Sequence, residues 1–295
     1  MFVPELARPI AIALAVLGAV FLALGAQFQN DAVTAHHAPN QFKLRSLHIK
    51  QVLDLLRRPR WLAGTSFMVL AIIFQLSALA LAPLIVVQPI GAIALIITSV
   101  VNARIYKIRL DAKTIGAILV IMLGVSGFVA FAATSAIQVK LDDSMLLQVV
   151  GVLLAVITTF GALFYLSKGR VGPLQYIFGA GVLYGFVASL AKVVIQRVIQ
   201  GDLNWLTLIA AISLIAAAIL GGWFVQNAYA AGPPDLVIAG LTVIDPAVAV
   251  GIAIVILGEA SNAQAGQMLG FGISGLVAIV GVLILSKVHP QLAAK

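Results

Sequence analysis

Long apolar runs dominate the chain, and short polar or basic stretches separate them. A run of about 20 apolar residues is long enough to cross the roughly 30 Å hydrocarbon core of a bilayer, so each run predicts a membrane-spanning helix. Proline, glycine and charged residues mark the boundaries between runs. The pattern predicts nine spans, at residues 8–28, 61–82, 84–105, 113–134, 146–167, 173–197, 204–230, 235–257 and 265–287.

Composition supports the same class of protein. Hydrophobic residues make up 62% of the chain and charged residues 9%, and the mean hydropathy is +1.13. A soluble core would not need so much apolar surface, so we expect an all-α, polytopic membrane protein. Residues 9–26 resemble a signal peptide, but no convincing Ala-x-Ala cleavage site follows them, and we interpret them as the first span. The chain has no cysteine, which excludes disulfides, thiol chemistry and thiolate metal sites.

Basic residues fall on alternate loops and predict the orientation. They gather in residues 43–60, 104–113 and 168–170, and at Lys287. By the positive-inside rule these segments are cytoplasmic, which puts the N-terminus outside and the C-terminus inside a cell membrane, either an inner or a plasma membrane. The net charge of +8 then reflects this cytoplasmic bias and contact with anionic lipids, and nucleic acid is not expected as a partner. Residues 46–58 predict an interfacial helix.

The sequence also repeats itself. Gln75 and Pro83 precede Gln226 and Pro234 by one shared offset, and Pro89 and Asn102 precede Pro246 and Glu259 by a slightly longer one. One short insertion reconciles the two offsets. We therefore expect a first repeat in residues 1–134, including a basic cytoplasmic loop at 30–60, a connecting fifth helix in 135–171, and a second repeat in 172–295. Because five helices separate each span from its counterpart, the two repeats would cross the membrane in opposite directions, as in many secondary transporters.

The segment from Gln75 to Ala92 and the segment from Leu241 to Glu259 carry a family resemblance. With Trp61 and Lys192, they resemble the drug/metabolite transporter superfamily, most closely its NIPA-like or EamA-like branch. The resemblance implies a carrier of inverted repeats that works by alternating access. Members of the superfamily move metabolites, nucleotide sugars or amphipathic drugs, and NIPA relatives are reported to move Mg²⁺. The usual plan has ten helices, so the nine predicted here favour the NIPA-like branch and put transfer of a drug-exporter specificity in doubt.

Two charges lie inside predicted spans, and we interpret both as candidates for substrate binding and translocation. Asp245 lies near the middle of the eighth span and precedes Pro246, which leaves a backbone carbonyl free. Lys192 lies towards the outer side of the sixth span. Burying either charge in hydrocarbon costs about 2.5–3.5 kcal/mol or more. The two would offset each other's cost if they faced one cavity. The alternatives are a salt-bridged packing residue for Asp245 and a snorkelling anchor for Lys192.

Neutral polar residues complete the predicted site. Gln75 and Gln226 take equivalent places in the second and seventh spans, while Gln88 is the repeat counterpart of Asp245. Such amides also act as ordinary contacts between helices. We expect the cavity to be lined by the first, second, third, sixth, seventh and eighth spans. The translocation residues predicted from the sequence are Asp245, Lys192, Gln75, Gln88, Gln226, Gln27 and Asn227.

The remaining chemistry is sparse. Glu259 and Asn102 are expected to be interfacial helix caps, and the histidines lie outside the spans without a zinc spacing. We expect no catalytic residues, metal site, cofactor or ATP-binding loop. The expected partners are a small-molecule substrate and membrane lipids. The sequence leaves open whether the protein forms a homodimer. The leading function is secondary transport of a small polar or amphipathic metabolite. The alternatives are a Mg²⁺ or other divalent-cation transporter, and a flippase for a lipid-linked phosphate headgroup.

Overall fold

The computed structural model describes residues 4–34, 59–105, 111–166, 172–231 and 234–288. These ranges form helices, and no strand occurs in them. The predicted interfacial helix at 46–58 lies outside them. The helices are α1 (Pro4–Thr34), α3 (Pro59–Leu81), α4 (Leu84–Val87), the 3₁₀ helix η1 (Gln88–Gly91), α5 (Ala92–Ile105), α6 (Ala112–Ser135), α7 (Asp143–Leu166), α8 (Pro173–Gln200), α9 (Trp205–Ala231), α10 (Pro234–Val255) and α11 (Ala265–Val288).

The described chain is an all-helical, multi-pass membrane protein by helix length and composition. Seven of the described helices are long and apolar enough to cross a bilayer, namely α1, α3, α6, α7, α8, α9 and α11. Two shorter apolar stretches, Leu84–Ile97 and Gly240–Val255, fall where the third and eighth spans were predicted. The third predicted span is broken, because η1 separates α4 from α5 at Pro89. Proline has no backbone N–H to donate, which accounts for a break at this position.

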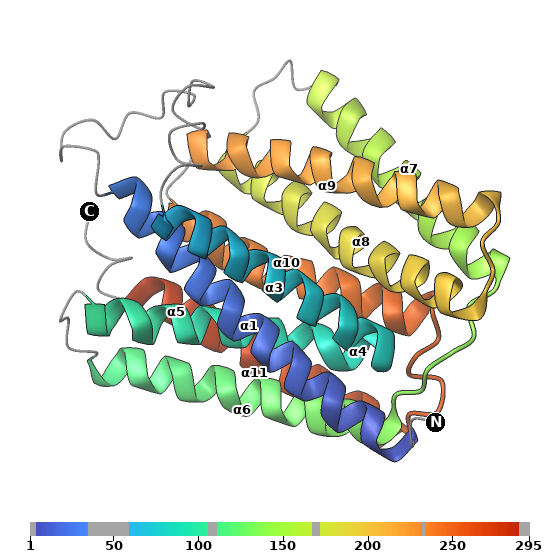
Figure 1. Cartoon of the computed structure of the whole chain (residues 1–295), viewed down its shortest axis with the longest axis horizontal. Coiled ribbons are helices and arrows are strands. Elements are labelled where there is room, and N and C mark those ends of the chain that lie inside the picture. Colours follow the sequence, from blue (N-terminus) through green and yellow to red (C-terminus); the bar gives the residue numbers. More distant parts are fainter. Residues whose placement is uncertain (1–3, 35–58, 106–110, 167–171, 232–233, 289–295) are drawn as a thin grey trace.

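The long helices run roughly along one direction, so the molecule has two distinct ends (Figure 1). At one end lie the starts of α3, α6, α8 and α10 and the last turns of α5 and α11. We call it the basic end, because its described side chains include the exposed Arg60, Arg104, Lys113 and Lys287. The opposite end holds the α3–α4, α6–α7, α8–α9 and α10–α11 connections. We call it the capped end, because buried and part-buried side chains bind helix termini there.

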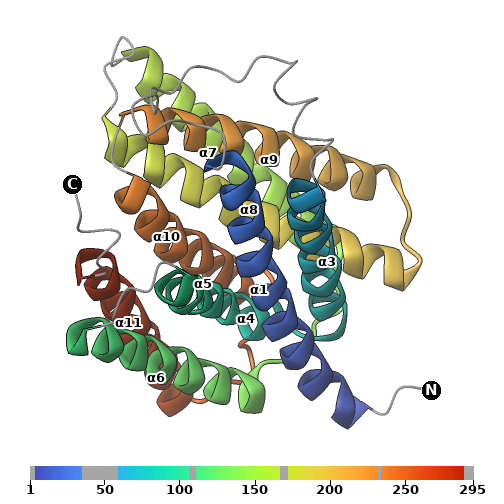
Figure 2. The same cartoon turned by 60° about the vertical axis from the view of Figure 1, so that its left-hand side comes forward.

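Helix pairs build the bundle. α1 packs along α3, α8 packs along both α9 and α10, and α6 packs along α11. The α6–α11 pair lies side by side in both views (Figure 2). Glycines permit the close approach in this pair, since a Cβ on Gly124 would lie 2.3 Å from the backbone nitrogen of Ala278. α7 packs against α8 and α9 through aromatic rings, including Phe160 and Phe224, whose centroids are 6.0 Å apart.

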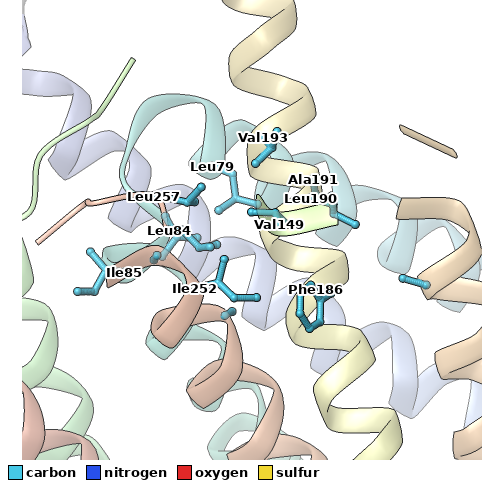
Figure 3. Close-up of a cluster of buried hydrophobic side chains, with 14 of the residues drawn as sticks. Leu79, Leu84, Ile85, Val149, Phe186, Leu190, Ala191, Val193, Ile252 and Leu257 are labelled. Atoms are coloured by element: carbon cyan, nitrogen blue, oxygen red, sulfur yellow. The ribbon is translucent and has the colours of Figure 1, made fainter. Parts of the chain in front are cut away.

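The main hydrophobic cluster surrounds the break between α3 and α4. Leu79, Leu84 and Ile85 flank the break and are almost fully buried. Figure 3 shows them beside apolar side chains of α8 and of the α10 end, including Leu190 and Leu257. The broken backbone is therefore shielded from water on several sides, and its polar groups need partners from within the protein.

Candidate functional site

The break between α3 and α4 leaves helix termini inside the bundle. α3 ends at Leu81, and Pro83 precedes the first residue of α4. Ala82 and Pro83 are both buried. Helix termini carry carbonyl and N–H groups that have no partner in their own helix, and such groups are costly to bury unpaired. Charged side chains from distant parts of the chain bind both sides of this break.

Lys192 on α8 caps the end of α3. Its Nζ donates hydrogen bonds to the carbonyl oxygens of Leu79 and Ala82, each at 2.7 Å. The side chain is 2% exposed. The ammonium therefore lies inside the bundle on the carbonyl end of a helix, where the helix dipole favours positive charge. This geometry differs from that of a snorkelling anchor, whose charge reaches the lipid headgroups.

Glu259, in the connection between α10 and α11, caps the start of α4. Its two carboxylate oxygens accept hydrogen bonds from the backbone N–H groups of Leu84 and Ile85, both at 2.9 Å. The backbone turns sharply before it, since Gly258 has a φ of +66°, a conformation that favours glycine. Glu259 was expected to be an interfacial cap. It is a cap, but it is 3% exposed and serves a helix from the other half of the sequence.

Two amides strengthen the same region. Gln196 of α8 donates to the carbonyl oxygen of Ala80 at 3.1 Å, and Gln138 donates to that oxygen at 3.3 Å. The main chain adds a further tie, because the N–H of Ile137 donates to the carbonyl oxygen of Glu259 at 2.8 Å. Residues from α8, from the α6–α7 connection and from the α10–α11 connection thus converge on the α3–α4 break.

Asp245 lies elsewhere, on the face of α10 that packs against α8. Gly181 and Gly185 of α8 allow this contact, since an added Cβ would lie 2.6 Å from Ile244 Cβ or Val248 Cβ respectively. The Asp245 carboxyl interacts electrostatically with Tyr184, whose hydroxyl lies next to Gly222 of α9. The carboxyl therefore belongs to a region shared by α8, α9 and α10. Its Oδ1 atom is buried and has no hydrogen-bond partner.

The pairing of Lys192 with Asp245, which the sequence interpretation made conditional on a shared cavity, is not found. No ion pair joins them in the described part of the chain, and none joins Lys192 to Glu259, although the Glu259 charge acts on Lys192 from beyond ion-pair distance. The physical reason is that buried helix termini satisfy both Lys192 and Glu259, which leaves Asp245 outside the network. A carboxyl with one buried, unbonded oxygen can take up a proton, or bind a donor or cation that reaches it.

The predicted amides are dispersed over the bundle. Gln27 of α1 and Gln88 at the start of η1 are buried, Gln75 of α3 is half-buried, and Gln226 of α9 is exposed. Asn227 donates to the carbonyl oxygen of Trp223 in its own helix at 2.7 Å. In the described part of the chain the buried Oδ1 atom of Asp245 accepts no hydrogen bond from these side chains, so the structure does not gather the predicted set around one point.

An apolar cavity of about 230 Å³ lies on the other side of α10 from α8. It is lined by η1 and α5, α6, α10 and α11, including Pro89, Pro246, Phe128 and Phe271. The hydroxyl of Thr242, which also lines it, donates to Ile238 of its own helix at 2.8 Å. The expected cavity drew on the first, second, third, sixth, seventh and eighth spans, whereas this one uses α6 and α11, the predicted fourth and ninth spans.

The sequence interpretation missed several residues that the structure brings to these regions. Gln196, Gln138 and Tyr184 were not among the predicted site residues, and Glu259 was given only an interfacial role. The spacing of Lys192 and Gln196 by one helical turn was an available signal, since it puts both side chains on one face of α8. In the described residues, no group of three or more His, Cys, Asp or Glu side chains is arranged to hold a metal ion.

Comparison with known proteins gives a relative without an assigned activity. A protein of Corynebacterium glutamicum, described as uncharacterised, is 28% identical over 249 residues, which cover 82% of this chain and 84% of that relative. No family model matches the chain. No solved structure matches it either. The chain is therefore similar to a bacterial protein over most of its length.

Proposed function

We propose that this protein is a secondary membrane transporter of the drug/metabolite type, which moves a small polar or amphipathic metabolite by alternating access. In this proposal α4, η1 and α5 together form the third of nine spans, and α10 forms the eighth. The basic end faces the cytoplasm and the capped end faces outside. The energy comes from a gradient or from exchange.

The pattern of helix packing supports an inverted repeat. α1 packs along α3 as α8 packs along α9, and α1 also contacts α5 as α8 contacts α10. α6 and α11 pair with each other across the bundle. Exchanging the first to fourth spans for the sixth to ninth turns each of these helix contacts into another contact that is also present. A two-fold relation of this kind favours two alternative arrangements of the same helices.

The distribution of charge supports the orientation. Exposed basic side chains with no carboxylate close by in sequence mark the basic end at Arg60, Arg104 and Lys287. At the capped end, by contrast, Arg197 forms ion pairs with Asp143 at 2.6 Å and with Asp202 at 3.4 Å. An excess of basic residues is typical of the cytoplasmic side.

The observation that carries the proposal is the half-buried Asp245, whose Oδ1 atom is buried and has no hydrogen-bond partner. In a membrane protein an ionisable group of this kind is expensive and is by default functional. Its position next to Pro246 on α10, against the glycines of α8, puts it at a helix contact that can shift. We propose that Asp245 binds a proton or the substrate in turn, and that the change in its charge favours one arrangement of the helices over the other.

Glu259 and Lys192 are already bonded to the backbone, and this favours metabolite transport over transport of Mg²⁺ and over a phosphate-headgroup flippase. Mg²⁺ prefers several oxygen ligands, and the other buried carboxylate, Glu259, already accepts two backbone hydrogen bonds. A flippase for a phosphate headgroup needs an available cation, and the Lys192 ammonium is already bonded to two carbonyl groups. A neutral or cationic small molecule is the better match to a single carboxyl.

The proposal is tested by uptake into proteoliposomes from a panel of radiolabelled metabolites, with an imposed pH gradient. We expect at least one compound to accumulate with the wild-type protein and to lose gradient-driven accumulation with Asp245→Asn. Asp142→Asn is the matched control, because Asp142 is exposed and its side chain accepts hydrogen bonds from Ser144 and Met145 at the start of α7. Equal accumulation by Asp245→Asn and the wild type would remove Asp245 from the mechanism.

A further inference from the structure

The charged and polar contacts at the α3–α4 break join the two predicted repeats. Lys192 and Gln196 of α8 reach α3, and Glu259 reaches α4. The partners Leu79, Ala80 and Ala82 lie within one turn of the break. Opening the capped end between α3 and α8 therefore requires these bonds to separate, because they cross the line along which the halves would part.

We infer that Lys192 and Glu259 form a gate that holds the capped end closed, with the α3–α4 break as its hinge. This inference rests on the proposed transport by alternating access. Both residues are positioning residues: they act on the backbone of α3 and α4 and make no contact with a substrate. The structure then represents a state that is closed at the capped end.

The break is built to move as well as to be held. Pro83 carries no N–H, so the chain can pivot between α3 and α4 without losing an α-helical hydrogen bond at that residue. α4 has four residues and passes directly into η1, whose hydrogen bonding is weaker than that of an α-helix. The Lys192 and Glu259 side chains thus supply the fixation that the local backbone lacks.

In the open state of the gate, the Lys192 ammonium and the Glu259 carboxylate can serve as partners for each other. Among the described residues no ion pair joins Lys192 to Glu259 in the closed arrangement, but the two charges act on each other across the break. When the helix termini withdraw and water enters, the ammonium and the carboxylate can pair with each other, so neither remains alone. A network with two satisfied arrangements is what a reversible gate needs, because an unpaired buried charge would make one state inaccessible.

The chain offers a clean test, because it contains no cysteine. Ala82, which is fully buried at the break, is replaced by cysteine, and labelling by a membrane-impermeant maleimide is timed from the capped side of proteoliposomes. We expect slow labelling of Ala82→Cys alone. Labelling should be faster by on the order of tenfold when Glu259→Gln is added, the effect of losing one charge-assisted hydrogen bond. Asp142→Asn in the same background should leave the rate unchanged.

A milder variant covers the case in which Glu259→Gln does not fold. Glu259→Asp keeps the charge but shortens the side chain, so it cannot reach both N–H groups, and we expect a smaller increase in the same direction. Unchanged labelling in folded Glu259→Gln and Glu259→Asp would overturn the gate. Increased labelling in a protein that transports no substrate would support the gate and contradict the transporter. Substrate transport together with unchanged labelling would support the transporter and contradict the gate.

Discussion

Lys192 and Glu259 bind opposite sides of one helix break: the ammonium takes the carbonyl end of α3 and the carboxylate takes the N–H end of α4. Each charge meets the helix terminus whose dipole favours it. Asp245 belongs to neither cap. Lys192 and Glu259 thus hold the frame at the break, whereas the Asp245 carboxyl is available for binding.

Replacing Lys192 by methionine should destabilise the fold strongly. The substitution keeps a long side chain but leaves the carbonyl groups of Leu79 and Ala82 and the charge of Glu259 without their partner. Removing one member of a buried charge network costs about 3–5 kcal/mol. Thermal unfolding in detergent micelles measures this loss. Lys140→Met is the control, since Lys140 is exposed at the same end, and a similar midpoint for the two variants would contradict the capping role.

Asp245→Asn should have the opposite effect on stability. An amide is much cheaper to bury than a carboxylate with an unbonded oxygen, so we expect the variant to unfold at a higher temperature than the wild type. Functional sites commonly trade stability for activity in this way. The same unfolding assay measures the shift. A clear fall in the midpoint would indicate that Asp245 serves the packing of α10.

Two glycines that face different surroundings should respond to alanine with opposite signs. At Gly185 a Cβ would lie 2.6 Å from Val248 Cβ and 3.0 Å from the Asp245 carbonyl oxygen, so Gly185→Ala should separate α8 from α10. Overpacking of this kind costs about 1–3 kcal/mol. Gly251 of α10 has open space at its Cβ, and Gly251→Ala should stabilise by about 0.5–1 kcal/mol. Equal changes in stability for Gly185→Ala and Gly251→Ala would argue against a tight α8–α10 contact.

The orientation can be checked with single cysteines in this cysteine-free chain. Lys140→Cys, at the capped end, should react with an impermeant maleimide added to intact cells. Ala112→Cys, at the basic end, should react only after the membrane is made permeable. Both side chains are exposed in the bundle, so burial does not explain a difference. The reverse pattern would invert the assigned orientation.

The spans were predictable because apolar length is a local property of the sequence. Seven of the described helices fall where spans were expected, and Pro83 and Pro89 lie at the breaks before and within the third span, since proline removes a donor wherever it stands. The partner of Lys192 was not predictable in the same way. The choice between Asp245 and Glu259 depends on which helix terminus is buried beside α8, and this is a property of the packed bundle.

The cavity illustrates the same limit. Pro89 and Pro246, which the repeat pattern matches to each other, both line the apolar cavity between η1, α5, α6, α10 and α11. Its other walls come from α6 and α11, where Gly275 leaves room. Apolar periodicity indicates which residues are buried but not where neighbouring helices fail to fill the space between them.

Proton movement tests the central claim most directly. The protein is reconstituted with a pH-sensitive dye trapped in the liposome lumen, and a transported compound from the panel is added without an imposed gradient. We predict a substrate-dependent pH change with the wild type and with Asp142→Asn, and none with folded Asp245→Asn. A pH change of the same size in Asp245→Asn would contradict the assignment of Asp245 as the coupling carboxyl.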